Sequence, residues 1–130
     1  MLIEFLDFKE YSDEYGNLVP LETNINIPFE IKRVYYIYNV EAHITRGFHA
    51  HRNLHQVLIA LKGSVELNLE DKVEKMNIKL DQPTSGIYIG PMVWREMTNF
   101  TNDCILLVLA SDFYNPQDYI RDKSLFLKEI

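Results

Sequence analysis

The stretch Arg46-Gly-Phe-His49-Ala-His51-Arg-Asn-Leu-His55-Gln56, followed by Gly63, decides the fold and carries most of the chemistry that the sequence shows. Side chains two positions apart in a strand share one face, so His49 and His51 are predicted to point the same way. After a turn, Gln56 can return to that face. Two imidazoles on one face suit acid–base chemistry, because an imidazole titrates near neutral pH. We interpret the pair as functional and His43 and His55 as ordinary polar residues.

Short strand-like runs separated by turn residues extend to both sides of this stretch. The predicted strands cover residues 2–8, 18–22, 31–40, 46–51, 56–61, 64–69, 73–80, 85–89, 94–100 and 104–111. A turn is expected at 14–17, and hairpins at 62–63 and 70–72. Only the tail, residues 115–130, has helical spacing. About ten short strands predict an all-β jelly-roll barrel or sandwich with a short C-terminal helix.

Two of the predicted strands, 56–61 and 104–110, are apolar on both faces. A strand with one wet face should alternate between apolar and polar residues, so something must cover the second face. A partner subunit is the favoured cover, which predicts a homodimer. The alternative cover is the helix of the tail.

Length and charge restrict the class of protein. The 130 residues fit one domain. The net charge of −6 lies within residues 1–30, and the rest carries twelve charges of each sign. No basic stripe exists for nucleic acid, although a few convergent arginines could hold a small anion. One cysteine, no signal peptide and no membrane-length apolar run predict a soluble cytoplasmic protein.

The spacing His-x-His-x4-Gln-x6-Gly resembles the first motif of the cupin superfamily, where Gln56 replaces a usual glutamate. In the stretch that resembles the second motif, Arg95 stands where cupins place a metal-binding histidine. Arginine offers no lone pair and repels a cation, and two imidazoles alone bind metal weakly. We therefore expect no metal and no cofactor. The alternative is a metal-dependent cupin that uses His49, His51 and His55.

A second group of candidate residues comes from the run 31–38. Arg33 and Tyr35 share one face of this predicted strand, which would give the pocket a phosphate ligand and a phenol for proton transfer. Arg46 points away from the two histidines if its strand is regular. A bulge at Gly47 would turn Arg46 towards them, and the sequence leaves this open.

Several ordered motifs together resemble the sugar-nucleotide 3,4-ketoisomerase family, the WxcM-like cupins. They are Pro28-Phe-x-Ile-Lys-Arg-Val-Tyr-Tyr-Ile37, Arg46-Gly-Phe-His-Ala-His51, Gly86-Ile-Tyr-Ile-Gly-Pro91, Val108-Leu-Ala-Ser-Asp112 and Asp118-Tyr-Ile-Arg121. The resemblance implies an isomerase that converts dTDP-4-keto-6-deoxyglucose into a dTDP-3-keto-6-deoxyhexose. It also implies a single cupin domain over residues 1–130, in metal-free homodimers that exchange the N-terminal strands, about residues 1–30.

The resemblance implies roles for particular residues. His49 is expected to be the base, with His51 orienting or relaying and Tyr35 as a proton shuttle. The residues expected to bind substrate are Arg33, Arg46, Tyr15, Arg95 and Gln56. The pair Tyr15 and Arg95 resembles the branch that makes the gluco-like C4 epimer. A non-catalytic sugar-nucleotide-binding cupin is the rival from another class.

Overall fold

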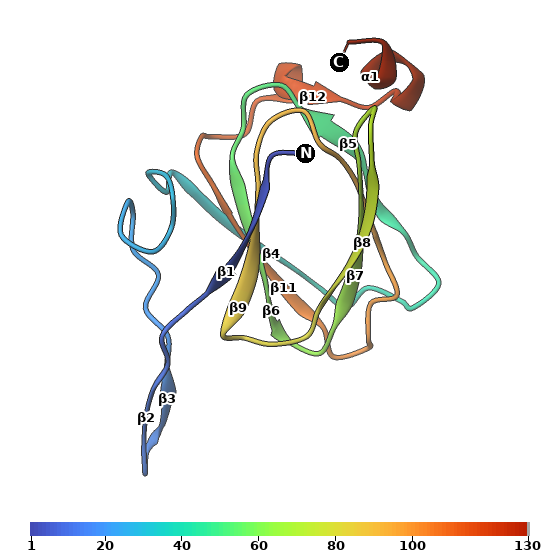
Figure 1. The fold of residues 1–130 in the computed structure, drawn as a ribbon. Coiled ribbons are helices and arrows are strands. Elements are labelled where there is room, and N and C mark those ends of the chain that lie inside the picture. The colour runs from blue at the N-terminus through green and yellow to red at the C-terminus, as the bar shows by residue number, and fades with distance from the viewer. Residues whose placement is uncertain (130) are drawn as a thin grey trace.

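The computed structural model describes residues 1–129, and two five-stranded antiparallel sheets face each other to form its barrel (Figure 1). The first sheet has the order β1-β9-β6-β11-β4 and the second β12-β5-β10-β7-β8. The first comprises β1 (Ile3–Asp7), β9 (Ser85–Ile89), β6 (Gln56–Lys62), β11 (Ile105–Ala110) and β4 (Arg33–Tyr38). The second comprises β12 (Tyr119–Ile120), β5 (Arg46–His51), β10 (Trp94–Thr98), β7 (Val65–Glu70) and β8 (Lys75–Leu80). The predicted all-β jelly roll with a short C-terminal helix is confirmed.

Alternating side chains build the core between the sheets. In β7 the residues Val65, Leu67 and Leu69 are buried and their neighbours are half-buried. They pack against Leu58, Ala60, Leu106 and Val108 of the facing sheet. The cavity described below is lined instead mainly by polar and aromatic residues.

The chain itself covers the outer face of β6 and β11. Ile27 and Phe29, from the segment that links the N-terminal hairpin to β4, pack there on Val57, Ile59 and Leu109. The tail helix α1 (Lys123–Glu129) packs elsewhere, with Phe126 against Ala50, Trp94 and Ile120. The alternative prediction, that the tail helix covers the outer face of β6 and β11, is therefore wrong. A partner subunit is not needed to cover the centre of these strands either, because Ile27 and Phe29 pack there.

Three local expectations also fail. Residues 62–63 do not close a hairpin, because β6 and β7 belong to different sheets and the turn at Gly63 carries the chain between them. The expected strand 18–22 ends at Leu18, after β3 (Gly16–Leu18). The tail is not one helix: it forms the 3-10 turn Pro116–Asp118, then β12, then α1, while Ile130 lies outside the described residues.

A two-stranded hairpin of β2 (Tyr11–Asp13) and β3 extends away from the barrel (Figure 1). Its turn, Glu14–Tyr15, lies within the predicted turn at 14–17. Tyr11, Tyr15 and Leu18 are exposed on it, and Tyr15 reaches 89% exposure. Among residues 1–129, no helix is long and apolar enough to span a membrane.

Candidate active site

A β-bulge in β5 shapes the entrance to the site. Opposite β10, His49 pairs with Arg95 and Gly47 pairs with Glu96, so Phe48 is the extra residue. Gly47 and Phe48 have φ of +96° and +55°. A Cβ at Gly47 would lie 2.9 Å from the carbonyl oxygen of Arg95, which explains the glycine. The bulge brings Arg46 onto the same cavity as His49, which settles the question that the sequence left open.

This cavity has a volume of about 360 Å³ and is rich in cationic and aromatic side chains. The residues that line it include Arg33, Tyr35, Arg46, His49, Met97, Tyr119 and Arg121. They come from β4, β5, β10 and the segment at β12, so strands far apart in sequence build the wall together. Three guanidinium groups on one small cavity favour a ligand with phosphate or other anionic oxygens.

His49 and His51 share a face of β5, as predicted, with ring centroids 4.8 Å apart. The Nδ1 of His49 lies 3.0 Å from the carbonyl oxygen of Gly47. The Nδ1 of His51 lies 3.1 Å from the carboxylate oxygen Oδ2 of Asp118. Both partners can only accept, so each Nδ1 donates a hydrogen and each Nε2 keeps its lone pair. The Nε2 of His51 is buried and has no partner among the described residues.

Burial keeps both imidazoles neutral. Desolvation, and after it the positive charge of Arg95, lowers the pKa of His49 from its usual 6.5 to about 4. The same two causes, in the same order, lower the pKa of His51 further, and His49 itself adds to the effect. A neutral imidazole with a free lone pair can act as a base at neutral pH.

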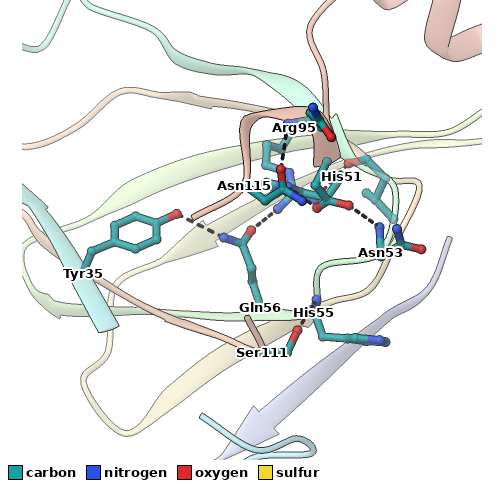
Figure 2. Close-up of polar contacts among 11 residues, drawn as sticks. Tyr35, His51, Asn53, His55, Gln56, Arg95, Ser111 and Asn115 are labelled. Carbon is teal, nitrogen blue, oxygen red and sulfur yellow. Dashed lines mark hydrogen bonds and ion pairs between the residues drawn. The ribbon is translucent and has the colours of Figure 1, made fainter. Parts of the chain in front are cut away.

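Behind the histidines, Arg95, Gln56 and Tyr35 form a hydrogen-bonded chain (Figure 2). Arg95 donates to the amide oxygen of Gln56, and the amide nitrogen of Gln56 lies 3.1 Å from the hydroxyl of Tyr35. Arg95 and Gln56 are each 2% exposed. Gln56 is not among the residues that line the cavity. Desolvation lowers the pKa of Arg95 to about 10, so it remains a cation.

These residues do not fit a cupin metal. A guanidinium occupies the place of one ligand and an amide the place of the carboxylate, and Arg95 places a buried positive charge beside both imidazoles. Residues 1–129 contain no cluster of three or more potential ligands. His55, the third histidine of the metal-dependent alternative, lies with its Nδ1 2.6 Å from the Tyr88 hydroxyl instead.

Sequence reasoning missed Asp118, Tyr119 and Arg121. The ring of Tyr119 contacts His49 and His51, with centroids 4.9 and 4.4 Å away, and the guanidinium of Arg121 lies 4.3 Å from the Tyr119 ring centroid. These residues lie in the motif Asp118-Tyr-Ile-Arg121, which supports the family resemblance. Because the tail is predicted to be helical, the sequence does not indicate that β12 pairs with β5. A second cavity of about 130 Å³ shares Arg33 and Tyr119 with the first and borders His51.

Tyr15, like Gln56, is an expected site residue that does not line the cavity. It lies at the tip of the β2–β3 hairpin, away from the barrel (Figure 1). Of the other expected residues, Arg33, Tyr35, Arg46 and His49 line one cavity. His51 borders the other cavity, and the buried Arg95 pairs with His49 across strands β10 and β5.

Comparison with known proteins agrees with this description of a cupin-like barrel. The family model described as "FdtA: WxcM-like, C-terminal" matches residues 1–130, and the chain belongs to this family. A TDP-4-oxo-6-deoxy-α-D-glucose-3,4-oxoisomerase from Aneurinibacillus thermoaerophilus is 50% identical over 125 residues, 96% of this chain and 90% of that protein.

Two solved structures extend the comparison. One is the 3,4-ketoisomerase QdtA from Thermoanaerobacterium thermosaccharolyticum, solved as a mutant with asparagine for a histidine and in complex with TDP-4-keto-6-deoxyglucose. It is 51% identical to this chain, with a TM-score of 0.96. The match covers 98% of this chain and 92% of that one. The TDP-quinovose 3,4-ketoisomerase WlaRB from Campylobacter jejuni is 46% identical with a TM-score of 0.94, covering 98% of both chains.

Proposed function

We propose that this protein is a 3,4-ketoisomerase that converts dTDP-4-keto-6-deoxyglucose into the corresponding dTDP-3-keto-6-deoxyhexose. The observation that carries the proposal is a neutral His49, with a free Nε2, on a cavity bordered by three arginines. The relatives at 50% and 51% identity are named as 3,4-isomerases, and one of them was solved with this 4-keto sugar bound.

The chemistry follows from the acidity of the C3 hydrogen next to the C4 ketone. His49 removes this proton, which gives an enediolate with a double bond between C3 and C4. Tyr35 donates its hydroxyl hydrogen to the oxygen on C4 and takes the hydrogen of the C3 hydroxyl. Because H3 and H4 are trans in the gluco-like product, a solvent proton is delivered to C4 on the ring face opposite His49, and the C3 oxygen becomes the ketone. Protonated His49 passes its proton to solvent. His51 orients His49 or relays its proton, and each of these groups ends in its starting state.

Binding of the anionic substrate falls to the arginines. Arg33, Arg46 and Arg121 would hold the diphosphate or sugar oxygens, since guanidinium pairs with such oxygens in charge-assisted hydrogen bonds. The buried cation of Arg95 favours the negative charge of the enediolate and disfavours protonated histidine. No step requires a metal, and the unsuitable ligand set supports a metal-independent reaction.

We further propose a homodimer in which the N-terminal hairpin reaches the partner. A two-stranded hairpin is at best marginally stable alone, and this one exposes Tyr11, Tyr15 and Leu18. Val34, Tyr36 and Tyr38 remain exposed on the outer face of β4 and offer an apolar surface for a second copy. Tyr15 would thereby approach the partner's cavity. We propose a cytoplasmic location for this dimer, in keeping with the single, buried cysteine.

For the product we propose the gluco-like configuration at C4. The pair Tyr15 and Arg95 is the basis, because the family resemblance connects these positions to the face of the enediol that receives the proton. The name of the relative from Campylobacter jejuni, a TDP-quinovose ketoisomerase, agrees with this choice, since quinovose is 6-deoxyglucose.

The test is turnover of dTDP-4-keto-6-deoxyglucose by the purified protein, followed by NMR. The expected result is loss of the C4 carbonyl signal, appearance of a C3 carbonyl, and a C4 proton in the gluco-like configuration. Turnover should survive EDTA treatment, in protein shown by elemental analysis to lack stoichiometric metal. Binding of the sugar nucleotide without carbonyl migration would instead support a non-catalytic binding protein.

A further inference from the structure

The hydrogen-bonded chain behind the histidines has a fixed direction. Arginine can only donate, and Arg95 donates to the amide oxygen of Gln56 and to the carbonyl oxygen of Val93, 3.0 Å away. The amide of Gln56 therefore has its oxygen towards Arg95 and its nitrogen towards Tyr35 (Figure 2). Both residues are buried, so neither end of the amide can turn to water instead.

This direction determines what the Tyr35 hydroxyl can do. Its oxygen accepts a hydrogen bond from the amide nitrogen of Gln56, 3.1 Å away, and that nitrogen cannot accept one in return. In the part of the chain that the structure describes, the hydroxyl has no other hydrogen-bond partner. Tyr35 lines the cavity next to His49, so the hydroxyl hydrogen is left for a ligand there.

A carboxylate at position 56 would reverse this arrangement. Glutamate has the same shape, but both of its oxygens accept, so one oxygen would pair with Arg95 and the other would take the hydrogen of Tyr35. The hydroxyl would then present only lone pairs to the cavity. An amide at position 56 thus leaves the Tyr35 hydroxyl hydrogen for a ligand in the cavity, whereas a carboxylate would take that hydrogen.

We propose that Gln56 is a positioning residue that makes Tyr35 a hydrogen-bond donor towards the oxygen on C4 of the substrate. The inference rests on the proposed function for the identity of that oxygen, but the direction of the hydrogen bond is a property of the resting protein. Gln56 acts through Tyr35 and does not touch the substrate itself.

The test compares Gln56→Glu with Gln56→Met, which is similar in size and removes the amide without supplying a strong acceptor. For Gln56→Glu we expect kcat to fall about 100-fold, the lower range for loss of a proton donor. KM and the affinity for TDP should stay within about threefold, because the arginines are unchanged. Gln56→Met should lose less, since the hydroxyl stays free to turn towards the substrate. Gln82→Glu, which makes the same chemical change at an exposed site, is the matched control.

A second readout does not depend on turnover. The pKa of Tyr35 is raised by burial and partly lowered again by the hydrogen bond from Gln56. It should therefore rise in Gln56→Met and rise further in Gln56→Glu, where the carboxylate holds the hydrogen. Proteins with ¹³Cζ-labelled tyrosine report this by NMR, and Tyr35→Phe identifies the signal.

The outcomes separate the two proposals. Wild-type protein without isomerase activity would refute the proposed function, while the order of the Tyr35 pKa values would still decide the direction of the hydrogen bond. A Gln56→Glu protein with kcat close to wild type, or with an unchanged Tyr35 pKa, would overturn the positioning role. If Gln56→Glu does not fold, an unchanged Tyr35 pKa in Gln56→Met overturns it equally.

Discussion

Asp118 holds the ring of His51 in one tautomer: its Oδ2 lies 3.1 Å from Nδ1 of the imidazole. Its other oxygen, Oδ1, accepts the backbone N–H of Asn53 at 2.8 Å, so the carboxylate itself is fixed. His51 is completely buried and its Nε2 has no partner among the described residues. The carboxylate thus keeps the lone pair of His51 on the side away from Asp118.

Asp118→Asn should therefore disturb the site without unfolding the barrel. The amide can present its N–H₂ to Nδ1 of His51, which would move the proton to Nε2 and remove the lone pair there. We expect kcat to fall about 100-fold with a small change in KM, measured in steady-state assays. Asp81→Asn, at an exposed position, is the matched control. Equal kcat values for the two variants would contradict a role for Asp118 through His51.

The decrease of kcat/KM on the acid side of the pH profile should occur at an unusually low pH. Because desolvation and Arg95 lower the pKa of His49 to about 4, the base stays neutral as the pH falls from 7 to 5. The value of kcat/KM should be nearly constant over this range, whereas with a base of pKa 6.5 it would fall about 25-fold between pH 7 and pH 5. Initial rates at each pH, with TDP binding measured in parallel, test this. An acid limb centred near pH 6.5 would show that the base is not the buried His49.

Arg95→Met extends the same test. Loss of the buried cation removes one of the two main causes of the low His49 pKa, so the acid limb should move to higher pH.

The histidine face and the all-β class were predictable because period-two patterning is local. The same holds for Arg33 and Tyr35 on one face of β4. The residues that cover the outer face of β6 and β11 were not predictable, since Ile27 and Phe29 come from an irregular segment that has no periodic pattern. Nor was Asp118, because its contact with His51 depends on the two-residue strand β12, which is too short to show alternation.

The role of the β5 bulge in placing Arg46 can be tested by substituting Gly47. Gly47→Ala places a Cβ 2.9 Å from the carbonyl oxygen of Arg95, at a φ of +96° that side chains disfavour. We expect a loss of about 1–3 kcal/mol in the free energy of unfolding, measured by urea denaturation, together with weaker TDP binding. Gly63→Ala is the control: its Cβ also clashes, 2.2 Å from Thr101 Oγ1, but away from the cavity. It should lose stability and keep its TDP affinity, and equal affinity in the two variants would contradict a role for the bulge in placing Arg46.

The exchanged hairpin predicts complementation between two inactive variants. Tyr15→Ala removes a side chain that is 89% exposed within one chain, so it should leave the stability of that chain unchanged while lowering activity. When Tyr15→Ala and His49→Asn proteins are mixed and allowed to exchange subunits, each mixed dimer should regain one complete site. Activity should then recover to about a quarter of wild type at random pairing. No recovery, in mixtures that mass analysis shows to contain mixed dimers, would mean that Tyr15 does not serve the partner's site.

The most direct test of the central claim follows proton loss from C3 and proton gain at C4 with dTDP-4-keto-6-deoxyglucose in D2O, comparing wild type with His49→Asn by NMR. The proposed mechanism predicts that the wild-type product has its carbonyl at C3 and solvent deuterium at C4. The His49→Asn protein should bind TDP but move no carbonyl and introduce no deuterium. An unchanged sugar after incubation with the wild-type protein, or equal rates for the two proteins, would contradict it.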